Sequence, residues 1–320
     1  MSQGVNSATL ALQGARNRPA GVRFARALGR FCRTKKVGAF GLVLTLFMVV
    51  IAIIGPAIIP YDKDQTFDQP NPKFDPASFD REALSPTTLD RLSNPSMDHW
   101  MGTDDKGRDL LTRIILGARL SLQVGVAASA LATIIGAAIG IVSGYVGGLF
   151  DLIVQRFVDA MIAIPGTLFL LLMLQTSEPS KTTTISALTV LGIFGASRLV
   201  RSAVLSIRNE VYIQAARAVG ASAPRIMVWH VLPNVAAPLL IVFTIQIGGN
   251  ILAESGLAFL GLGVPGPSWG QMVATSRLFV DSKPLMSVFA GGAITLTVLG
   301  LNLLGDALRD VFDPRQRGTK

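Results

Sequence analysis

Long stretches without a charged side chain constrain this chain more than any other feature. Residues 37–59 contain no Asp, Glu, Lys or Arg, and about 20 such residues cross the ~30 Å hydrocarbon core of a bilayer as a helix. Further uncharged stretches, some completed by flanking residues, are 120–150, 160–177, 182–197, 231–253 and 285–305. The pattern predicts an all-α integral membrane protein, a bundle of six spans.

The composition excludes several other classes of protein. Half of the 320 residues are hydrophobic, only 15% are charged and the mean hydropathy is +0.50, which is not typical of a soluble globule. The single cysteine, Cys32, has no cysteine for an internal disulfide and no nearby histidine with which to bind a metal. The excess of basic residues lies between apolar runs, so membrane topology explains it better than nucleic acid binding.

The basic residues also predict the orientation in the membrane. Residues 1–36 carry eight Lys or Arg and no acid, which places this basic tail in the cytoplasm. Six spans return the C-terminal tail, 306–320, to the same side. The first span, 37–59, is then followed by an external loop, 60–119, and a membrane core, 120–305.

The external loop changes character along its length. Residues 60–98 are rich in Pro, Asp and Ser, which predicts irregular structure. Asp109 then has the position of an N-cap for a helix whose apolar face excludes Arg113 and Arg119. We expect this to be an interfacial helix that leads into span two. The alternative is a simple extension of span two.

Three features within the spans stand out. Arg156 and Asp159 are one helical turn apart and are expected to pair, with a proton or ion relay as the alternative. Glu254, near the outer end of span five, is expected to line a polar passage or to reach the headgroups. Glycine recurs at every fourth position of span two and predicts close helix packing within this chain, with a contact to another subunit as the alternative: Gly136, Gly140, Gly144 and Gly148.

Residues 198–233 form the only long polar segment that is predicted on the cytoplasmic side between two spans. Three arginines at its start share one side of a helix: Arg198, Arg201 and Arg208. This basic stripe is suited to anionic lipid headgroups.

Two short helices follow within 209–233. Asn209 is expected to cap the first, which runs to Val219 and ends in a left-handed turn at Gly220. Ser222 is expected to cap the second, which Pro233 stops or kinks. The predicted apolar sides are Val211, Ala215, Ala216 and Val219 in the first helix, and Ile226 and Trp229 in the second. Such a pair of helices could dock in a groove of a cytoplasmic partner. The alternative is an amphipathic hairpin that lies on the lipid surface.

At these residues the chain resembles the permease subunits of binding-protein-dependent ABC importers, which carry an E-A-A-x3-G signature. Residues 212–220 read YIQAARAVG, 225–227 read RIM and 230–234 read HVLPN. More narrowly, the chain is similar to the oligopeptide, dipeptide and nickel group. Segments that agree are 102–109 (GTDDKGRD), 117–122 (GARLSL), 259–263 (FLGLG), 267–270 (PSWG), 302–306 (NLLGD) and 313–315 (DPR).

The resemblance implies a coupling element that inserts into a cleft of an ATPase subunit and transmits its closure to the spans. The residues that it implies for this contact are Gln214, Ala215, Ala216, Arg217, Gly220, Ala221 and Arg225. Gln214 replaces the usual glutamate of the family, and Glu210 lies one turn earlier. The long external loop and N-terminal tail resemble the second, C-type permease of the peptide systems.

The implied partners are a second homologous permease, two ATPase subunits that hold ATP and magnesium, an external solute-binding protein and a peptide. The implied location is the bacterial inner membrane, with both termini in the cytoplasm. Nothing in the sequence predicts an active site, a cofactor site or a metal site in this chain. No lysine follows a glycine, so there is no P-loop, and residues 261–266 (GLGVPG) are expected to form a turn.

The leading hypothesis is therefore a non-catalytic permease subunit of an ATP-driven peptide importer. A nickel or metal-chelate importer is the first alternative. An ion-coupled secondary transporter is favoured less, because the span centres hold few ionisable residues. An integral membrane enzyme is also disfavoured, since no cluster of His, Asp or Glu lies at one membrane face.

Overall fold

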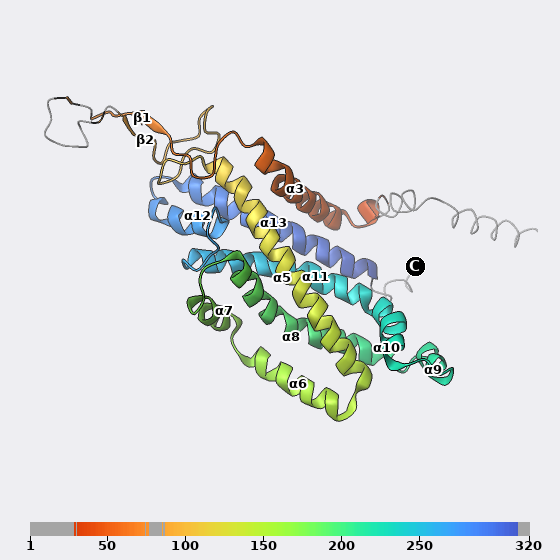
Figure 1. Ribbon diagram of the computed structural model, residues 1–320. Coiled ribbons are helices and arrows are strands. Elements are labelled where there is room, and N and C mark those ends of the chain that lie inside the picture. The colour runs from red at the N-terminus through yellow and green to blue at the C-terminus, as the bar shows by residue number, and fades with distance from the viewer. Residues whose placement is uncertain (1–28, 30, 74, 77–84, 86, 313–320) are drawn as a thin grey trace, which may run out of the picture.

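The computed structural model describes residues 29, 31–73, 75–76, 85 and 87–312 (Figure 1). Most of the basic tail predicted at 1–36 therefore lies outside the described residues, as does the part of the C-terminal tail from 313 to 320. The motif residues 313–315 lie there too.

Long apolar helices form the body of the protein: α3 (Lys36–Ile58), α5 (Leu110–Val146), α8 (Lys181–Ile207), α11 (Leu232–Phe259) and α13 (Pro284–Phe312). Within the described residues, five helices are long and apolar enough to cross a membrane, or six if a bent pair, α6 and α7, counts as one span. The prediction of an all-α membrane bundle is confirmed. Predicted spans one, two, four, five and six each fall on one of these helices.

The third span is not the single helix that was predicted at 160–177. Instead, α6 (Gly148–Ala163) and α7 (Gly166–Gln175) meet at an angle of 80°. Ile164 between them has extended backbone, with φ −73° and ψ 124°, the conformation that the ring of Pro165 favours in the residue before it. The prediction was wrong because the break at Pro165 lies inside the uncharged stretch.

The separate interfacial helix is also a wrong prediction, because α5 continues without a break from Leu110 to Val146. Its N-cap is Asp109, as expected: the carboxylate accepts a hydrogen bond of 2.8 Å from the backbone N–H of Thr112. Arg113 does not face away from the protein. Its residue is only 5% exposed, and its guanidinium lies 3.4 Å from Asp104 and 3.8 Å from Asp64 of the loop.

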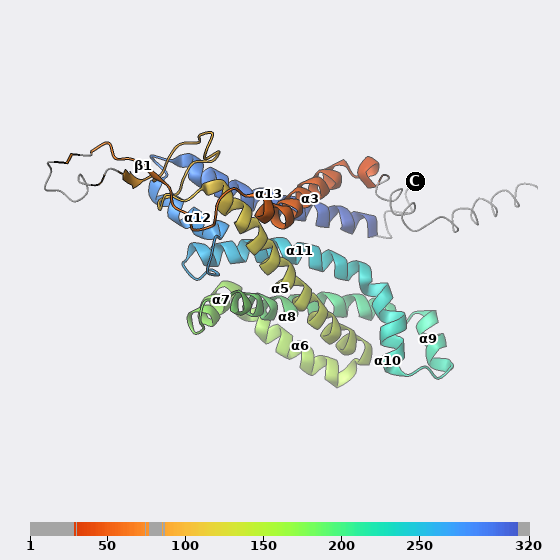
Figure 2. The same ribbon diagram turned by 45° about the horizontal axis from the view of Figure 1, so that its top comes forward.

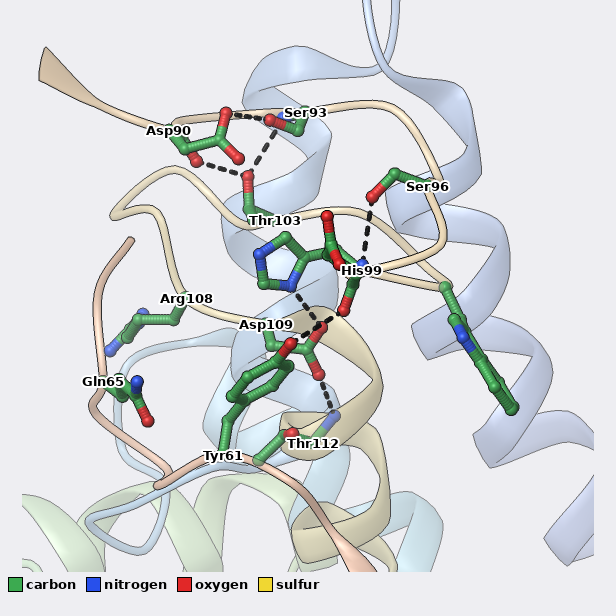
Figure 3. A network of polar contacts seen from close by, with 12 residues as sticks. Tyr61, Gln65, Asp90, Ser93, Ser96, His99, Thr103, Arg108, Asp109 and Thr112 are labelled. Carbon is green, nitrogen blue, oxygen red and sulfur yellow. Dashed lines mark hydrogen bonds and ion pairs between the residues drawn. The ribbon is translucent and has the colours of Figure 1, made fainter. Parts of the chain in front are cut away.

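The loop before α5 has more order than its composition predicted. Strands β1 (Asp68–Pro70) and β2 (Thr87–Leu89) pair antiparallel, with Gln69 opposite Thr88. Nearer to α5, a network of polar contacts joins His99 to the helix cap (Figure 3). His99 Nδ1 lies 3.0 Å from the carboxylate of Asp109, and both side chains are buried. The loop is therefore fastened to the start of α5.

The glycine stripe of α5 packs against α8, as predicted for contacts within one chain. A Cβ on Gly140 would lie 2.5 Å from the carbonyl oxygen of Ser197 and 2.9 Å from Cβ of Val200, so only glycine permits this approach. Gly136 and Gly144 meet α8 in the same way. Gly148 does not take part in the packing of α5 against α8. It is the first residue of α6, and no atom would lie within 4 Å of a Cβ added at this position.

A short helix, α12 (Trp269–Ser276), followed by the 3-10 turn η2 (Arg277–Phe279), closes the end of the bundle at which the loop lies. The carboxylate of Glu254 is fully buried there and accepts hydrogen bonds of 3.0 Å from Ser121 of α5 and Ser268. Trp269 donates from its indole N–H to the carbonyl oxygen of Ile114, 2.9 Å away. Glu254 thus links helices instead of reaching the headgroups. We call this end of the bundle the loop end.

Candidate functional site

The two short helices expected at 209–233 form α9 (Val211–Ala218) and α10 (Ala223–Ile226), and we call residues 209–233 the coupling element. The element projects from the end of the bundle opposite the loop end, beyond the ends of α5 and α8 (Figures 1 and 2). We call this the coupling end.

The turn between α9 and α10 has the hydrogen bonds of a Schellman motif. Gly220 has φ +79°, the left-handed conformation that was predicted. Its N–H donates to the carbonyl oxygen of Arg217 at 2.9 Å, and the N–H of Ala221 donates to that of Ala216 at 3.0 Å. A side chain at position 220 would be strained, and a proline would also remove the first hydrogen bond.

Buried side chains fasten the coupling element to the bundle. Ile213 and Ala216 of α9 and Ile226 of α10 are buried in one cluster with Val204 of α8 and Ile141 of α5. The predicted apolar side of α9 is therefore only partly right, since Ala216 is buried while Val211 and Val219 are among the most exposed large hydrophobic residues. Trp229, expected on the same side as Ile226, is also exposed. The coupling element has a buried inner face, and its exposed residues include both apolar and charged side chains.

The structure brings the seven residues implied by the resemblance into this one element, on two faces. Gln214, Ala215, Arg217, Gly220 and Arg225 are exposed, whereas Ala216 is buried and Ala221 is partly buried.

Contacts that the sequence did not predict hold two of these residues. Arg217 Nε donates to the hydroxyl of Tyr145 at 3.2 Å, with the guanidinium 4.9 Å from the ring centre. Gln214 Nε2 donates to the carbonyl oxygen of Asn209 at 2.9 Å. Asn209 is not the N-cap as predicted, because that position belongs to Glu210.

Pro233 does not stop the second short helix, so the kink is the part of that prediction that stays open. A π-helical turn, η1 (Met227–Val231), joins α10 directly to α11, so that the run Ala223–Phe259 forms one candidate span. Pro233 is the second residue of α11 and directly follows this π-helical turn. The coupling element is therefore the end of span five itself.

The three arginines of the stripe at the end of α8 all have partners within the chain. Arg201 donates two hydrogen bonds to the carboxylate of Asp151 in the first turn of α6, from Nε at 2.6 Å and from Nη2 at 2.5 Å. Ser143 of α5 also donates to Asp151. Arg198 pairs with Asp159, and Arg208 donates to a carbonyl oxygen of α5.

The predicted contact between Arg156 and Asp159 is present, with 3.9 Å between the charged atoms, and it lies on an exposed surface. In addition, Asp159 pairs with the arginine at position 198 of α8. The contact with α8 holds α6 beside that helix.

Nothing in the described part of the chain is arranged as a metal or nucleotide site. No group of three or more His, Cys, Asp or Glu side chains there is placed to hold a metal ion. The glycine-rich residues 261–266 form the connection between α11 and α12, with left-handed backbone at Gly261 and Gly266. They form a turn, as predicted, and no strand precedes them as a dinucleotide site requires.

Comparison with known proteins identifies the family. Residues 110–318 match the inner membrane component of binding-protein-dependent transport systems. The chain belongs to this family of transport permeases. Residues 23–77 match the N-terminal transmembrane domain of oligopeptide transport permease C. The resemblance stated from the sequence is thereby confirmed, and the permease is a multi-pass inner membrane protein.

The relatives of this permease match along most of their length. The dipeptide transport system permease protein DppC of Alkalihalophilus pseudofirmus is 38% identical, over 89% of this chain and 88% of that protein. The oligopeptide transport system permease protein OppC of Bacillus subtilis is 34% identical, over 91% and 89%. The glutathione transport system permease protein GsiD of Escherichia coli is 34% identical, over 86% of each chain.

Among solved structures, the permease is similar to a chain of the inward-facing MetNI methionine ABC transporter. The TM-score is 0.53 at 20% sequence identity, with 63% of this chain and 97% of that chain covered. At this level of identity the likeness concerns the fold alone. The part of the permease outside the match is more than a third of its length.

Proposed function

We propose that this permease forms half of the membrane pathway of an ATP-driven importer for peptides that an external solute-binding protein delivers. Similarity to dipeptide and oligopeptide permeases along about nine-tenths of the chain is the observation that supports a peptide substrate. A second homologous permease would supply the other half of the pathway.

In this proposal the coupling end faces the cytoplasm, with both termini, and the loop end faces the binding protein. Two ATPase subunits bind ATP and magnesium and perform the hydrolysis. The exposed face of the coupling element fits a groove in such a partner, because Val211 and Val219 are apolar and uncovered. Gln214, Ala215, Arg217, Gly220 and Arg225 are the contact residues, while Ala216 and Ala221 hold the element in place.

The helix geometry supplies a route from the ATPase to the pathway. Because α10 runs through η1 into α11, a displacement of the coupling element moves the end of a span directly. The element is also packed on Val204 of α8 and Ile141 of α5, so these helices receive the same displacement. Closure of the ATPase pair would then shift the bundle between inward-facing and outward-facing packings.

A measurement of uptake by intact cells tests whether the substrate is a peptide or a nickel chelate. We expect deletion of this permease to abolish uptake of a labelled peptide and plasmid-borne permease to restore it, while uptake of nickel chelate is unchanged. The matched control is the same plasmid without the permease, which should leave peptide uptake abolished. Loss of nickel-chelate uptake with normal peptide uptake would refute the peptide assignment.

A further inference from the structure

A tight turn in the loop, residues 96–102, has one buried face and one exposed face. Two backbone hydrogen bonds close it: the N–H groups of Ser96 and Gly102 both donate to the carbonyl oxygen of His99, at 2.8 and 2.9 Å. The imidazole of His99 points inward to Asp109 and packs against the ring of Tyr61, as Figure 3 shows. The backbone of the turn is thus fixed from its inner side.

The outer face of this turn carries two large apolar side chains. Met97 is 91% exposed and Trp100 is 72% exposed. The indole N–H of Trp100 donates to the carbonyl oxygen of Met97 at 3.1 Å, so the polar edge of the ring has a partner within the turn itself. An indole satisfied in this way can enter a less polar medium without losing a hydrogen bond.

One contact of the turn, and one of Asn94 two residues before it, reach the ends of two spans. The hydroxyl of Tyr61, three residues beyond the end of α3, donates to the carbonyl oxygen of Asp98 at 3.1 Å. Lys283, which immediately precedes α13, donates from Nζ to Oδ1 of Asn94 at 2.7 Å. The turn therefore lies at the height at which α3 and α13 emerge at the loop end.

The same ends of α3 and α13 expose apolar side chains. Ile53 and Ile58 of α3, and Leu285 and Val288 of α13, are all exposed large hydrophobic residues. In an inner membrane protein, uncovered aliphatic side chains on a span face hydrocarbon. Tryptophan is enriched where spans leave the hydrocarbon, with its ring at the level of the headgroups. The exposed Met97 and Trp100 of the turn are side chains suited to this level of the bilayer.

We infer that the 96–102 turn is a membrane-interface anchor, with Met97 and Trp100 inserted at the boundary between headgroups and acyl chains. Because His99 of the turn contacts the carboxylate that caps α5, the anchor also fixes the start of that helix against the bilayer. The partner is the lipid surface. This inference is independent of what the permease transports.

Fluorescence quenching by lipid tests the anchor. A bimane probe is attached at Met97→Cys or Trp100→Cys, with Cys32 and reactive partner cysteines replaced by serine, in the assembled transporter. The vesicles contain phosphatidylcholine brominated near the glycerol end of its acyl chains, or the same lipid without bromine. Lys106→Cys, on an exposed residue that lines the charged cavity of the loop, is the matched control.

We expect bromolipid to quench the probes at positions 97 and 100 at least about twofold more than the control probe, since they sit at the interface. Aqueous iodide should quench the control more strongly. The inference fails if iodide quenches all three probes equally and bromolipid quenches none. It fails equally if the probes respond to added solute-binding protein and not to bromolipid, because the turn would then be a protein-docking surface.

Discussion

Gly220→Pro is expected to abolish co-purification of the ATPase subunits with the permease, and with it peptide uptake. Proline holds φ near −65°, whereas position 220 requires +79°. It also removes the N–H that donates to Arg217 at 2.9 Å. The direction of α10 relative to α9 would change, although Ile213 and Ile226 would still anchor each helix.

Gly220→Asn is the matched control, because asparagine tolerates the left-handed conformation and no atom lies within 4 Å of a Cβ at this position. We expect near-normal association. Ala215→Arg provides an independent variant: the residue is exposed, so the fold is kept while the docking face acquires a bulky charge. Wild-type association of both Gly220→Pro and Ala215→Arg would refute the docking assignment.

Arg201→Ala is expected to be the most destabilising single change at the coupling end. Asp151 is mostly buried and accepts two hydrogen bonds from Arg201, so the variant leaves an uncompensated carboxylate between α5, α6 and α8. Removing one partner of a buried ion pair lowers the free energy of unfolding by about 3 kcal/mol or more. Because Arg201 is partly exposed, we expect a loss near this lower value. The thermal melting midpoint in detergent should fall by several degrees.

Arg198→Ala is the control for this effect on the same helix. Arg198 pairs with Asp159, but Asp159 keeps Arg156 as a second partner, so we expect the loss of Arg198 to cost less than the loss of Arg201. Its melting midpoint should remain close to that of the wild type. Equal shifts for the two variants would contradict the special role of the contact between Arg201 and Asp151.

The spans were predictable because a long uncharged stretch has few alternatives to crossing the membrane. Their ends were not, because distant contacts decide them. Arg113 looked like a residue that faces away from the protein, yet Asp64 and Asp104 of the loop surround it and α5 runs through it unbroken. Conversely, Pro165 breaks a stretch that composition alone reads as continuous, while Pro233 lies inside the helical run Ala223–Phe259, directly after a π-helical turn.

The candidate site was predictable where its geometry is local. A glycine after a short helix favours the left-handed turn that Gly220 adopts. The burial of Ile213 depends on packing against α8 and α5, which no periodicity within eight residues encodes. Likewise, the arginine stripe was visible, but its partner Asp151 lies 50 residues earlier, and only the fold brings the two together.

The most direct test asks whether ATP or an ion gradient powers uptake. Our central claim is that separate ATPase subunits drive this permease through its coupling element. The assembled transporter is placed in vesicles with the ATPase side facing out, and peptide movement is followed with ATP present and ionophores dissipating every ion gradient. If ATPase subunits drive the permease, transport continues under these conditions and stops when ATP is withdrawn. Transport that stops with the gradient while ATP remains would contradict it.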